Sequence, residues 1–300
     1  MDMTQNKCCR HGASLRRRRR RRRKILRSII FSCSIIAVAV FVAVGSRMIT
    51  SGDGGTNKYD VEAGNNTYDN AVIENSKITE KNKIQNEQSM LDDIMNSTQY
   101  PKQLKELALK NEEALEFVYD YPAEHVKKHT IDLTEEASMD SVPLFVQWDK
   151  RWGYEKYSGN FFAASGCGPT TLSMVVVYLT HNRDASPLAV AKYSKEAGYS
   201  VDGSGSSWTL ISEGCRHYGV KAKTVALDES RMKAELDAGH PIVVNVGPGD
   251  FTDTGHFMVI TGYDDEGFSI NDPNSIEKSG KRWLFKNISS QIRAVWSMYV

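Results

Sequence analysis

Cys167 is the residue of this 300-residue chain whose neighbours in the sequence most clearly favour a reactive side chain, a thiolate. It stands in the run Gly166-Cys-Gly-Pro169, directly before an apolar stretch. Proline favours the first position of a helix, so we expect the thiol at a helix N-terminus, where the dipole and free N–H groups stabilise a thiolate. The two glycines would let a substrate backbone approach. The competing interpretation is a small apolar cysteine beside two turn glycines.

His256 is the candidate base that such a thiol needs. It joins the small loop Thr254-Gly255 to the apolar run Phe257-Met-Val-Ile260, which predicts a strand. A rigid strand can aim a side chain that stands at its end. The remaining histidines of the chain lie in polar segments, loops or helix ends, where no buried strand adjoins them.

Asp272 is the candidate acceptor that would orient His256 and fix its tautomer. It follows the next predicted strand, residues 267–271, in the run Asn271-Asp-Pro273. Asn274 competes for the same role. The alternative interpretation of Asp272 is structural, because an Asp-Pro pair commonly begins a turn.

The expected pairing of the two strands sets a condition on this arrangement. If Tyr263 pairs with Phe268, His256 lies opposite Ser275, and Asp272 lies about 10 Å further along at ~3.4 Å per residue. A bulge or a splayed strand end must then bring Asp272 and His256 together.

The other cysteines and histidines indicate neither a disulfide framework nor a metal site. Of the 5 cysteines, only Cys167 and Cys215 lie beyond the first fifty residues. Cys215 falls in an expected helix, where a core position is the better interpretation. No group of histidines, cysteines and carboxylates has the spacing of metal ligands, so we expect no metal and no cofactor.

The predicted elements run from helices to strands, which indicates an α+β domain with separate helical and sheet layers. The helices are expected at residues 169–179, 187–197, 206–218 and 229–238. The strands are expected at residues 241–246, 256–261, 267–271, 282–285 and 294–299.

The N-terminal residues have a different character. Eight arginines, residues 16–23, precede an uncharged apolar stretch at residues 28–46 that is long enough for one bilayer span. We therefore expect a basic cytoplasmic tail at residues 1–24, a transmembrane signal-anchor helix at residues 25–47 and everything after it outside the cytoplasm. A cleaved signal peptide, giving a secreted protein, is the alternative.

Three further segments follow the apolar stretch. Residues 48–90 are polar and rich in Gly and Asn, which predicts a disordered stalk. Residues 91–140 show helical spacing of apolar residues and are expected to form a helical N-terminal extension. Residues 141–300 are long enough for one core and carry the candidate site. No basic stripe with interleaved aromatics indicates nucleic-acid binding.

Several motifs, in their order and spacing, resemble those of the C39-like peptidases, a group of papain-like cysteine proteases. The resemblance covers most of residues 141–290. Its motifs are Val142-Pro-Leu-Phe-Val-Gln147, Trp148-Asp-Lys-Arg-Trp-Gly153, Gly166-Cys-Gly-Pro169, Gly255-His-Phe257 and Asn271-Asp-Pro273. Residues 111–118 and 120–122 also look like family material.

The resemblance implies a papain-like fold with Cys167 as nucleophile, His256 as base and acid, and Asp272 as orienting residue. It also implies that Gln147 forms an oxyanion hole with the Cys167 backbone N–H. Bacteriocin-processing members carry that glutamine only a few residues before the cysteine, whereas Gln147 precedes Cys167 by twenty. A simple packing role beside Trp148 is the alternative for Gln147.

The resulting hypothesis is a membrane-anchored extracytoplasmic cysteine peptidase that hydrolyses peptide or amide bonds of peptide or protein substrates. An acyltransferase or amidase with the same residues is a second hypothesis. A non-catalytic peptide-binding module on a stalk is a third. The sequence does not indicate the substrate or the oligomeric state.

Overall fold

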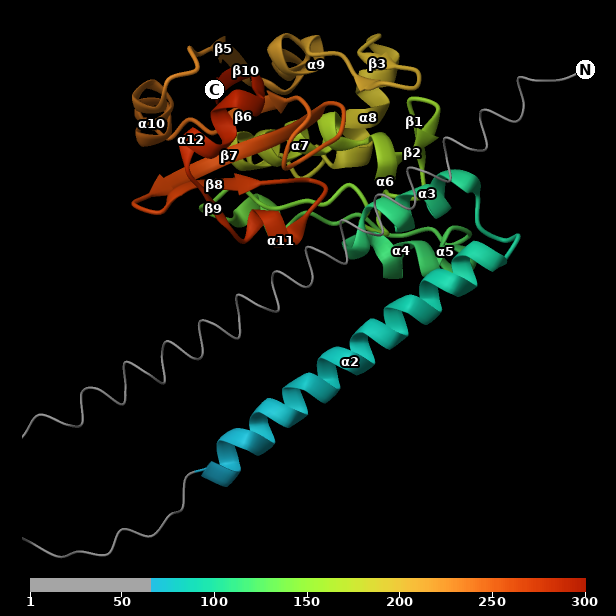
Figure 1. Cartoon of the computed structure of the whole chain (residues 1–300). Coiled ribbons are helices and arrows are strands. Elements are labelled where there is room, and N and C mark those ends of the chain that lie inside the picture. Colours follow the sequence, from blue (N-terminus) through green and yellow to red (C-terminus); the bar gives the residue numbers. More distant parts are fainter. Residues whose placement is uncertain (1–65) are drawn as a thin grey trace, which may run out of the picture. The chain divides into compact units, whose positions relative to one another are not determined.

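Figure 1 shows the computed structural model, which describes the backbone of residues 66–300 and the side chains from residue 79 onward. The expected cytoplasmic tail, the expected transmembrane helix at residues 25–47 and the first part of the expected stalk lie outside the described residues. Within the described part, no helix combines the length and the apolar character that a bilayer crossing requires.

A six-stranded antiparallel sheet with the order β5-β10-β6-β7-β8-β9 is the largest element of the domain. Its strands are β5 (Lys221–Thr224), β6 (Ile242–Val246), β7 (His256–Asp264), β8 (Gly267–Asn271), β9 (Arg282–Trp283) and β10 (Ile292–Tyr299). Four of the five expected strands are confirmed with small shifts of their ends. The fifth, expected at residues 282–285, stops at Trp283 and gives way to α12 (Phe285–Ile288).

Both faces of the sheet are buried at its centre, in β6 and the first half of β7, and side chains alternate between the two faces along each strand. Val243 of β6 and Phe257 of β7 face the cluster that contains α7 (Cys167–Thr180). Their neighbours Val244 and Met258 belong to the opposite cluster.

The second cluster corrects the expectation that helices and sheet form two separate layers. It includes Met232 from α10 (Glu229–Asp237) and Ile288 from α12, so helices cover both faces. The reason is visible in β6, in which every residue is buried. A strand without an exposed face needs cover on both sides.

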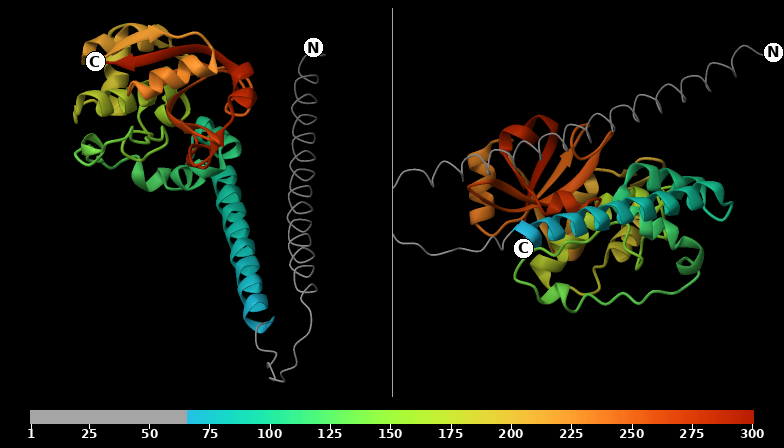
Figure 2. Two further views of the ribbon diagram at one scale, coloured as in Figure 1. Left: turned by 90° about the vertical axis from the view of Figure 1, so that its left-hand side faces the viewer. Right: turned by 60° about the horizontal axis from the view of Figure 1, so that its bottom comes forward.

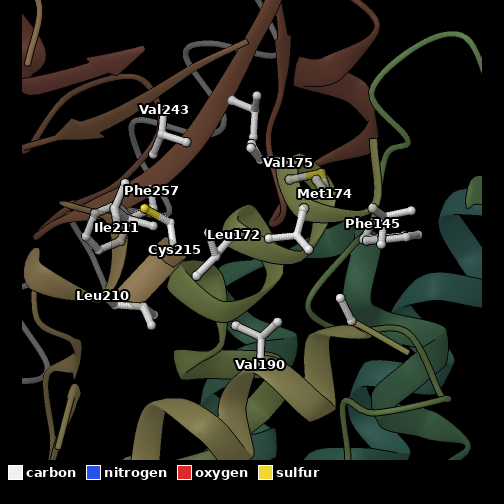
Figure 3. Packing of buried hydrophobic residues seen from close by; sticks show 14 of the residues in the cluster. Phe145, Leu172, Met174, Val175, Val190, Leu210, Ile211, Cys215, Val243 and Phe257 are labelled. Carbon is white, nitrogen blue, oxygen red and sulfur yellow. The ribbon is translucent and has the colours of Figure 1, made fainter. Parts of the chain in front are cut away.

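Helix α7 is the central buried element, apolar almost all round, and it packs against β7, α8 (Pro187–Glu196) and α9 (Thr209–Ser212). Figure 3 shows Leu172, Met174 and Val175 of α7 among residues from these neighbours. Ser186 caps α8 by accepting a hydrogen bond from the Ala189 N–H, a role for which serine is favoured.

The helix expected at residues 206–218 is two short pieces in the structure. Residues 205 and 206 pair in a small ladder, and α9 is followed by the 3-10 turn η3 (Gly214–Tyr218). Gly219 ends η3 in the left-handed conformation that favours glycine. The small ladder is formed by β3 (Ser200–Val201) and β4 (Gly205–Ser206).

The segment before the sheet domain forms a third apolar cluster. The segment contains α3 (Lys102–Lys110), η1 (Glu112–Ala114), α4 (Leu115–Tyr119), α5 (Tyr121–Glu124) and η2 (Glu136–Ser138), of which η2 packs instead in the cluster around α7 through Ala137. Leu104, Phe117 and Val118 pack in the third cluster with Phe161 and Ala163. The last two lie at β2 (Asn160–Phe161), which pairs with β1 (Lys156–Tyr157), and at α6 (Phe162–Ser165), so the cluster adjoins the segment that leads into α7.

Helix α2 (Asn66–Asn96) occupies much of the range that we expected to be a disordered stalk, and that expectation is wrong for residues 66–90. The prediction weighed only the low apolar content. Lys, Glu and Gln are good helix formers, and Lys83 and Glu87 lie one turn apart with 3.9 Å between their charged atoms. The C-terminal end of the helix is anchored because Ile94 is fully buried in the third cluster.

Candidate active site

Cys167 is the first residue of α7, so the thiol lies at a helix N-terminus as expected, but the helix begins two residues before Pro169, which was the predicted first position. The thiol is half-buried and free. Gly168 is needed beside it, because a Cβ at that position would lie 2.5 Å from Ser206 Oγ of β4. The structure therefore explains the second glycine by tight packing, whereas the sequence suggested substrate access.

The environment of Cys167 favours the thiolate. Burial by itself raises the pKa of the thiol, but a hydrogen bond to His256 and the charge of that histidine outweigh burial and lower the pKa below its ordinary value. The backbone N–H groups of Phe257 and Gly168 act in the same direction. Partners on a strand and on the helix itself thus meet at one sulfur.

His256 is the first residue of β7 and is buried, with 6% of its surface exposed. Its Nε2 lies 2.7 Å from Asp272 Oδ1, which leaves Nδ1 for the Cys167 sulfur. Burial by itself lowers the pKa of His256, but the charge and hydrogen bond of Asp272, assisted by Cys167, outweigh it and raise the pKa above its ordinary value. The two pKa shifts have the directions that a thiolate–imidazolium pair requires.

Asp272 reaches His256 because the strand pairing contains the bulge that the sequence required. Tyr263 pairs with Phe268 as expected, but the register shifts between Ile260 and Gly262, after which Val259 pairs with Asn271. Continued by one residue, the shifted register sets Asp272 opposite Met258. Met258 is two residues from His256 along β7, so the side chains of Asp272 and His256 lie on the same face of the pleated sheet. Without the register shift, Asp272 would lie opposite Val259, three residues from His256, and the two side chains would lie on opposite faces.

Asp272 is fully buried, and its carboxylate has few other partners. Its Oδ1 also accepts a hydrogen bond from the Asn274 N–H at 2.8 Å. Its Oδ2 has no hydrogen-bond partner among the described residues. A buried carboxylate is costly without a compensating charge, so His256 is the group that balances it.

Asn274, the competing orienting residue, faces a different way. Its Oδ1 accepts hydrogen bonds from Asn111 Nδ2 at 3.1 Å and from Gln147 Nε2 at 3.3 Å. Its backbone carbonyl accepts from Asn111 Nδ2 and from Trp148 Nε1. The structure thus sets Asp272 beside His256 and uses Asn274 to connect neighbouring segments.

Gln147, the predicted oxyanion donor, is buried and donates its side-chain amide within the protein. Nε2 lies 2.8 Å from the Ala163 carbonyl as well as near Asn274. Ala163 precedes Cys167 by four residues, so the amide packs against the turn before the nucleophile. An oxyanion role requires one of these N–H groups to be released toward the substrate, and it stays a prediction.

Cys215 and the other predicted features lie apart from this site. Cys215 is free and fully buried in the core around α7 (Figure 3), which confirms the expected core position. Within the described residues, no three or more histidine, cysteine or acidic side chains cluster in a way that could hold a metal ion. A hollow of about 460 Å³ lies between β1 and α8, and Cys167, His256 and Asp272 are not among its lining residues.

The sequence analysis missed Asn111 and Glu113, which contact the loop that carries Asp272. Glu113 accepts hydrogen bonds from the backbone N–H groups of Ile276 and Glu277 at 2.7 and 3.0 Å. The available signal was the likeness of residues 111–118 to family material, to which we assigned no role. Spacing cannot reveal the contact, because the partners are more than 160 residues apart.

A mixed domain of helices and antiparallel sheet, with a cysteine at the start of the buried helix and a histidine at the start of a strand, is the kind of fold found in cysteine peptidases. The model of the Peptidase C39 like family matches residues 139–300, more than half of the chain. The chain belongs to this family. No curated protein matches it.

Solved structures resemble the domain as well. The peptidase domain of Streptococcus ComA, a bifunctional ABC transporter involved in a quorum-sensing pathway, is similar with a TM-score of 0.39 and 18% identity, over 53% of this chain and 96% of that one. A C39-like peptidase candidate from Bacillus anthracis is similar with a TM-score of 0.33 and 17% identity, over 53% of this chain and 95% of that one.

Proposed function

We propose that this protein is a papain-like cysteine peptidase in which Cys167 is the nucleophile, His256 the base and acid, and Asp272 the orienting residue. The observation that carries the proposal is the chain of contacts at the start of α7. The Cys167 thiol interacts with His256, which lowers the thiol pKa, and Nε2 of His256 lies 2.7 Å from Asp272 Oδ1. Such a pairing of thiol, imidazole and carboxylate activates a sulfur nucleophile near neutral pH.

The reaction follows from the positions of these groups. The Cys167 thiolate attacks the carbonyl carbon of a peptide bond, and the C–N bond breaks as the imidazolium of His256 gives its proton to the leaving amine. The product is a thioester on Cys167. Water then attacks the thioester while His256 accepts one of its protons, which releases a carboxylic acid and regenerates the thiolate and the imidazolium.

The negative oxygen of the tetrahedral intermediate needs hydrogen-bond donors. The first N–H groups of a helix have no partner within the helix, so the Cys167 N–H at the start of α7 is suited to this role. Gln147 Nε2, which packs against the turn before Cys167 through the Ala163 carbonyl, is the second proposed donor. An acceptor amine in place of water would make the same residues an acyltransferase.

Labelling of the full-length protein with a peptidyl epoxide, followed by peptide mass mapping, tests the proposal. We expect the label on Cys167 at neutral pH, its loss in His256→Ala, and no change in Cys215→Ala. Absence of label, or equal labelling of Cys215, would favour the peptide-binding module. Product analysis with peptide substrates and added amines separates hydrolysis from acyl transfer.

Anchoring by one helix at residues 25–47, with the catalytic domain outside the cytoplasm, is part of the same proposal. Its support is the uncharged apolar stretch at residues 28–46 and the eight arginines before it. We expect the protein to stay in membranes washed with alkaline carbonate and to be cut by protease added from outside. Recovery of a shortened protein in the medium would show that the stretch is a cleaved signal peptide instead.

A further inference from the structure

The loop that carries Asp272 has little regular structure of its own. Residues 272–275 connect β8 to α11 (Ile276–Ser279), a helix of 4 residues. Its internal ties are a bridge between Asp272 and Ser275, the hydrogen bond from the Asn274 N–H to Asp272 Oδ1, and hydrogen bonds between Asp272 and Ser279. These ties lie within the loop itself, so the position of the whole loop, and of the Asp272 carboxylate with it, depends on contacts that other segments make.

The N-terminal extension supplies two of these contacts. Asn111 Nδ2 donates to the carbonyl oxygen and to the Oδ1 of Asn274 at 2.9 and 3.1 Å. The same side chain accepts a hydrogen bond from the Glu113 N–H through its own Oδ1 at 3.1 Å. Asn111 thus caps η1 with one side-chain atom and holds the Asp272 loop with the other.

Glu113 holds the other end of the loop. Its Oε2 accepts from the N–H groups of Ile276 and Glu277, and its Oε1 accepts from the Ser275 hydroxyl. Hydrogen bonds to an ionised acceptor are stronger than neutral ones, and the first N–H groups of α11 have no partner inside that helix. In Figure 2 the teal extension accordingly lies beside the orange and red C-terminal part of the chain.

The extension is itself firmly held. Leu104, Ala114, Phe117 and Val118 are buried in the cluster that includes Ala163, four residues before Cys167. One rigid segment therefore packs against the approach to the nucleophile and holds the loop of the orienting carboxylate. The family match begins at residue 139, so Asn111 and Glu113 lie outside it.

We propose that Asn111 and Glu113 are positioning residues of the peptidase site: they fix the 272–275 loop so that the Asp272 carboxylate stays within hydrogen-bond distance of His256. The inference rests on the proposed function. Within the matched region, the Gln147 N–H also holds this loop, at the Pro273 carbonyl at 2.7 Å. The extension adds the contacts at residues 274–277.

The test measures the reactivity of Cys167 in the full-length protein. The rate of iodoacetamide alkylation is followed against pH, with mass mapping to isolate Cys167, and the thermal midpoint is recorded for every variant. Glu113→Gln replaces the charged acceptor, and Asn111→Asp removes the donor to Asn274 but keeps the cap of η1. Glu116→Gln makes the same charge change on an exposed residue of α4 and serves as the control.

We expect Glu113→Gln and Asn111→Asp to move the Cys167 pH–rate profile toward that of an ordinary thiol. A displacement by one pH unit lowers the rate by about tenfold at pH values below the midpoint of the wild-type profile. Glu116→Gln should follow the wild-type profile. If Glu113→Gln does not fold, Asn111→Asp decides the question by itself.

Wild-type profiles in folded Glu113→Gln and Asn111→Asp, with only a lower thermal midpoint, would overturn the inference, because the two residues would then serve stability alone. Failure of the proposed function is distinguishable from that result. It would appear in the wild-type protein, as a Cys167 that reacts like an ordinary thiol, and the inference would fall with it.

Discussion

The two cysteines of the described domain have opposite environments. Cys167 stands at a helix start, half-buried, with His256 and two backbone N–H groups around its sulfur. Cys215 is fully buried among Leu210, Ile211 and other apolar residues, and burial raises the pKa of its thiol to about 11. The same side chain is thus a candidate nucleophile at one position and a small apolar core residue at the other. The difference lies in the partners that the fold brings to each sulfur.

The largest expected effect separates the two thiols by activity. Cys167→Ala should lower peptide hydrolysis by about 10⁴-fold or more, because it removes the attacking atom. Cys215→Ala should keep wild-type kcat/KM within a few fold. Assay of both variants on a peptide library that the wild-type protein cleaves checks the contrast, and residual activity in Cys167→Ala would remove this cysteine from the mechanism.

The next effect concerns the partner that distinguishes Cys167. His256→Ala removes the hydrogen bond and charge that lower the thiol pKa, as well as the proton donor for the leaving amine. Loss of general acid–base catalysis alone costs on the order of 10²- to 10⁴-fold in rate. The pH–rate profile of Cys167 alkylation should shift to higher pH in this variant. An unshifted profile would mean that the helix N-terminus alone activates the thiol.

A smaller effect is expected from Asp272→Asn, which keeps the shape of the orienting side chain and removes its charge. Without the carboxylate charge the pKa of His256 falls toward its ordinary value and the thiolate–imidazolium pair is less favoured, so the rate should fall by about tenfold to a hundredfold. The stability difference from the wild type also depends on pH. A raised His256 pKa contributes stability that is complete below its unfolded value of about 6.5 and is lost as pH rises through the folded value. Thermal unfolding should therefore show the largest deficit of Asp272→Asn below about pH 6.5 and a smaller deficit in alkaline solution; a constant deficit would contradict this account.

The smallest expected effect falls on the apolar cysteine. Cys215→Ser places a hydroxyl in the core around α7, which costs about 1–3 kcal/mol of unfolding free energy if the hydroxyl finds no partner. Cys167→Ser, at a half-buried helix start, should cost less. Urea unfolding of both variants measures the contrast. An equal loss at the two positions would show that the environments differ less than their burial indicates.

Local sequence predicted much of the helical and strand framework. The helix N-terminus at Cys167 follows from Pro169 to within two residues, and β6, β7 and β8 follow from their apolar patterns. The sequence reasoning failed where stability comes from distant partners. Helix α2 is too polar to be recognised by its apolar spacing. The strand pattern also did not show that the second face of the sheet is buried, by α10 and α12.

The sequence by itself determined the types of group at the candidate site: a cysteine at a helix start, a histidine at a strand start and an aspartate after the next strand. Tertiary structure decided how they meet. The bulge between Ile260 and Gly262 sets Asp272 on the same face as His256, and Asn111 and Glu113 hold the Asp272 loop from more than 160 residues away. A one-residue change of register moves a side chain to the other face of a sheet, and hydrogen bonds between distant segments leave no periodic trace in the chain, so neither could be derived from local pattern.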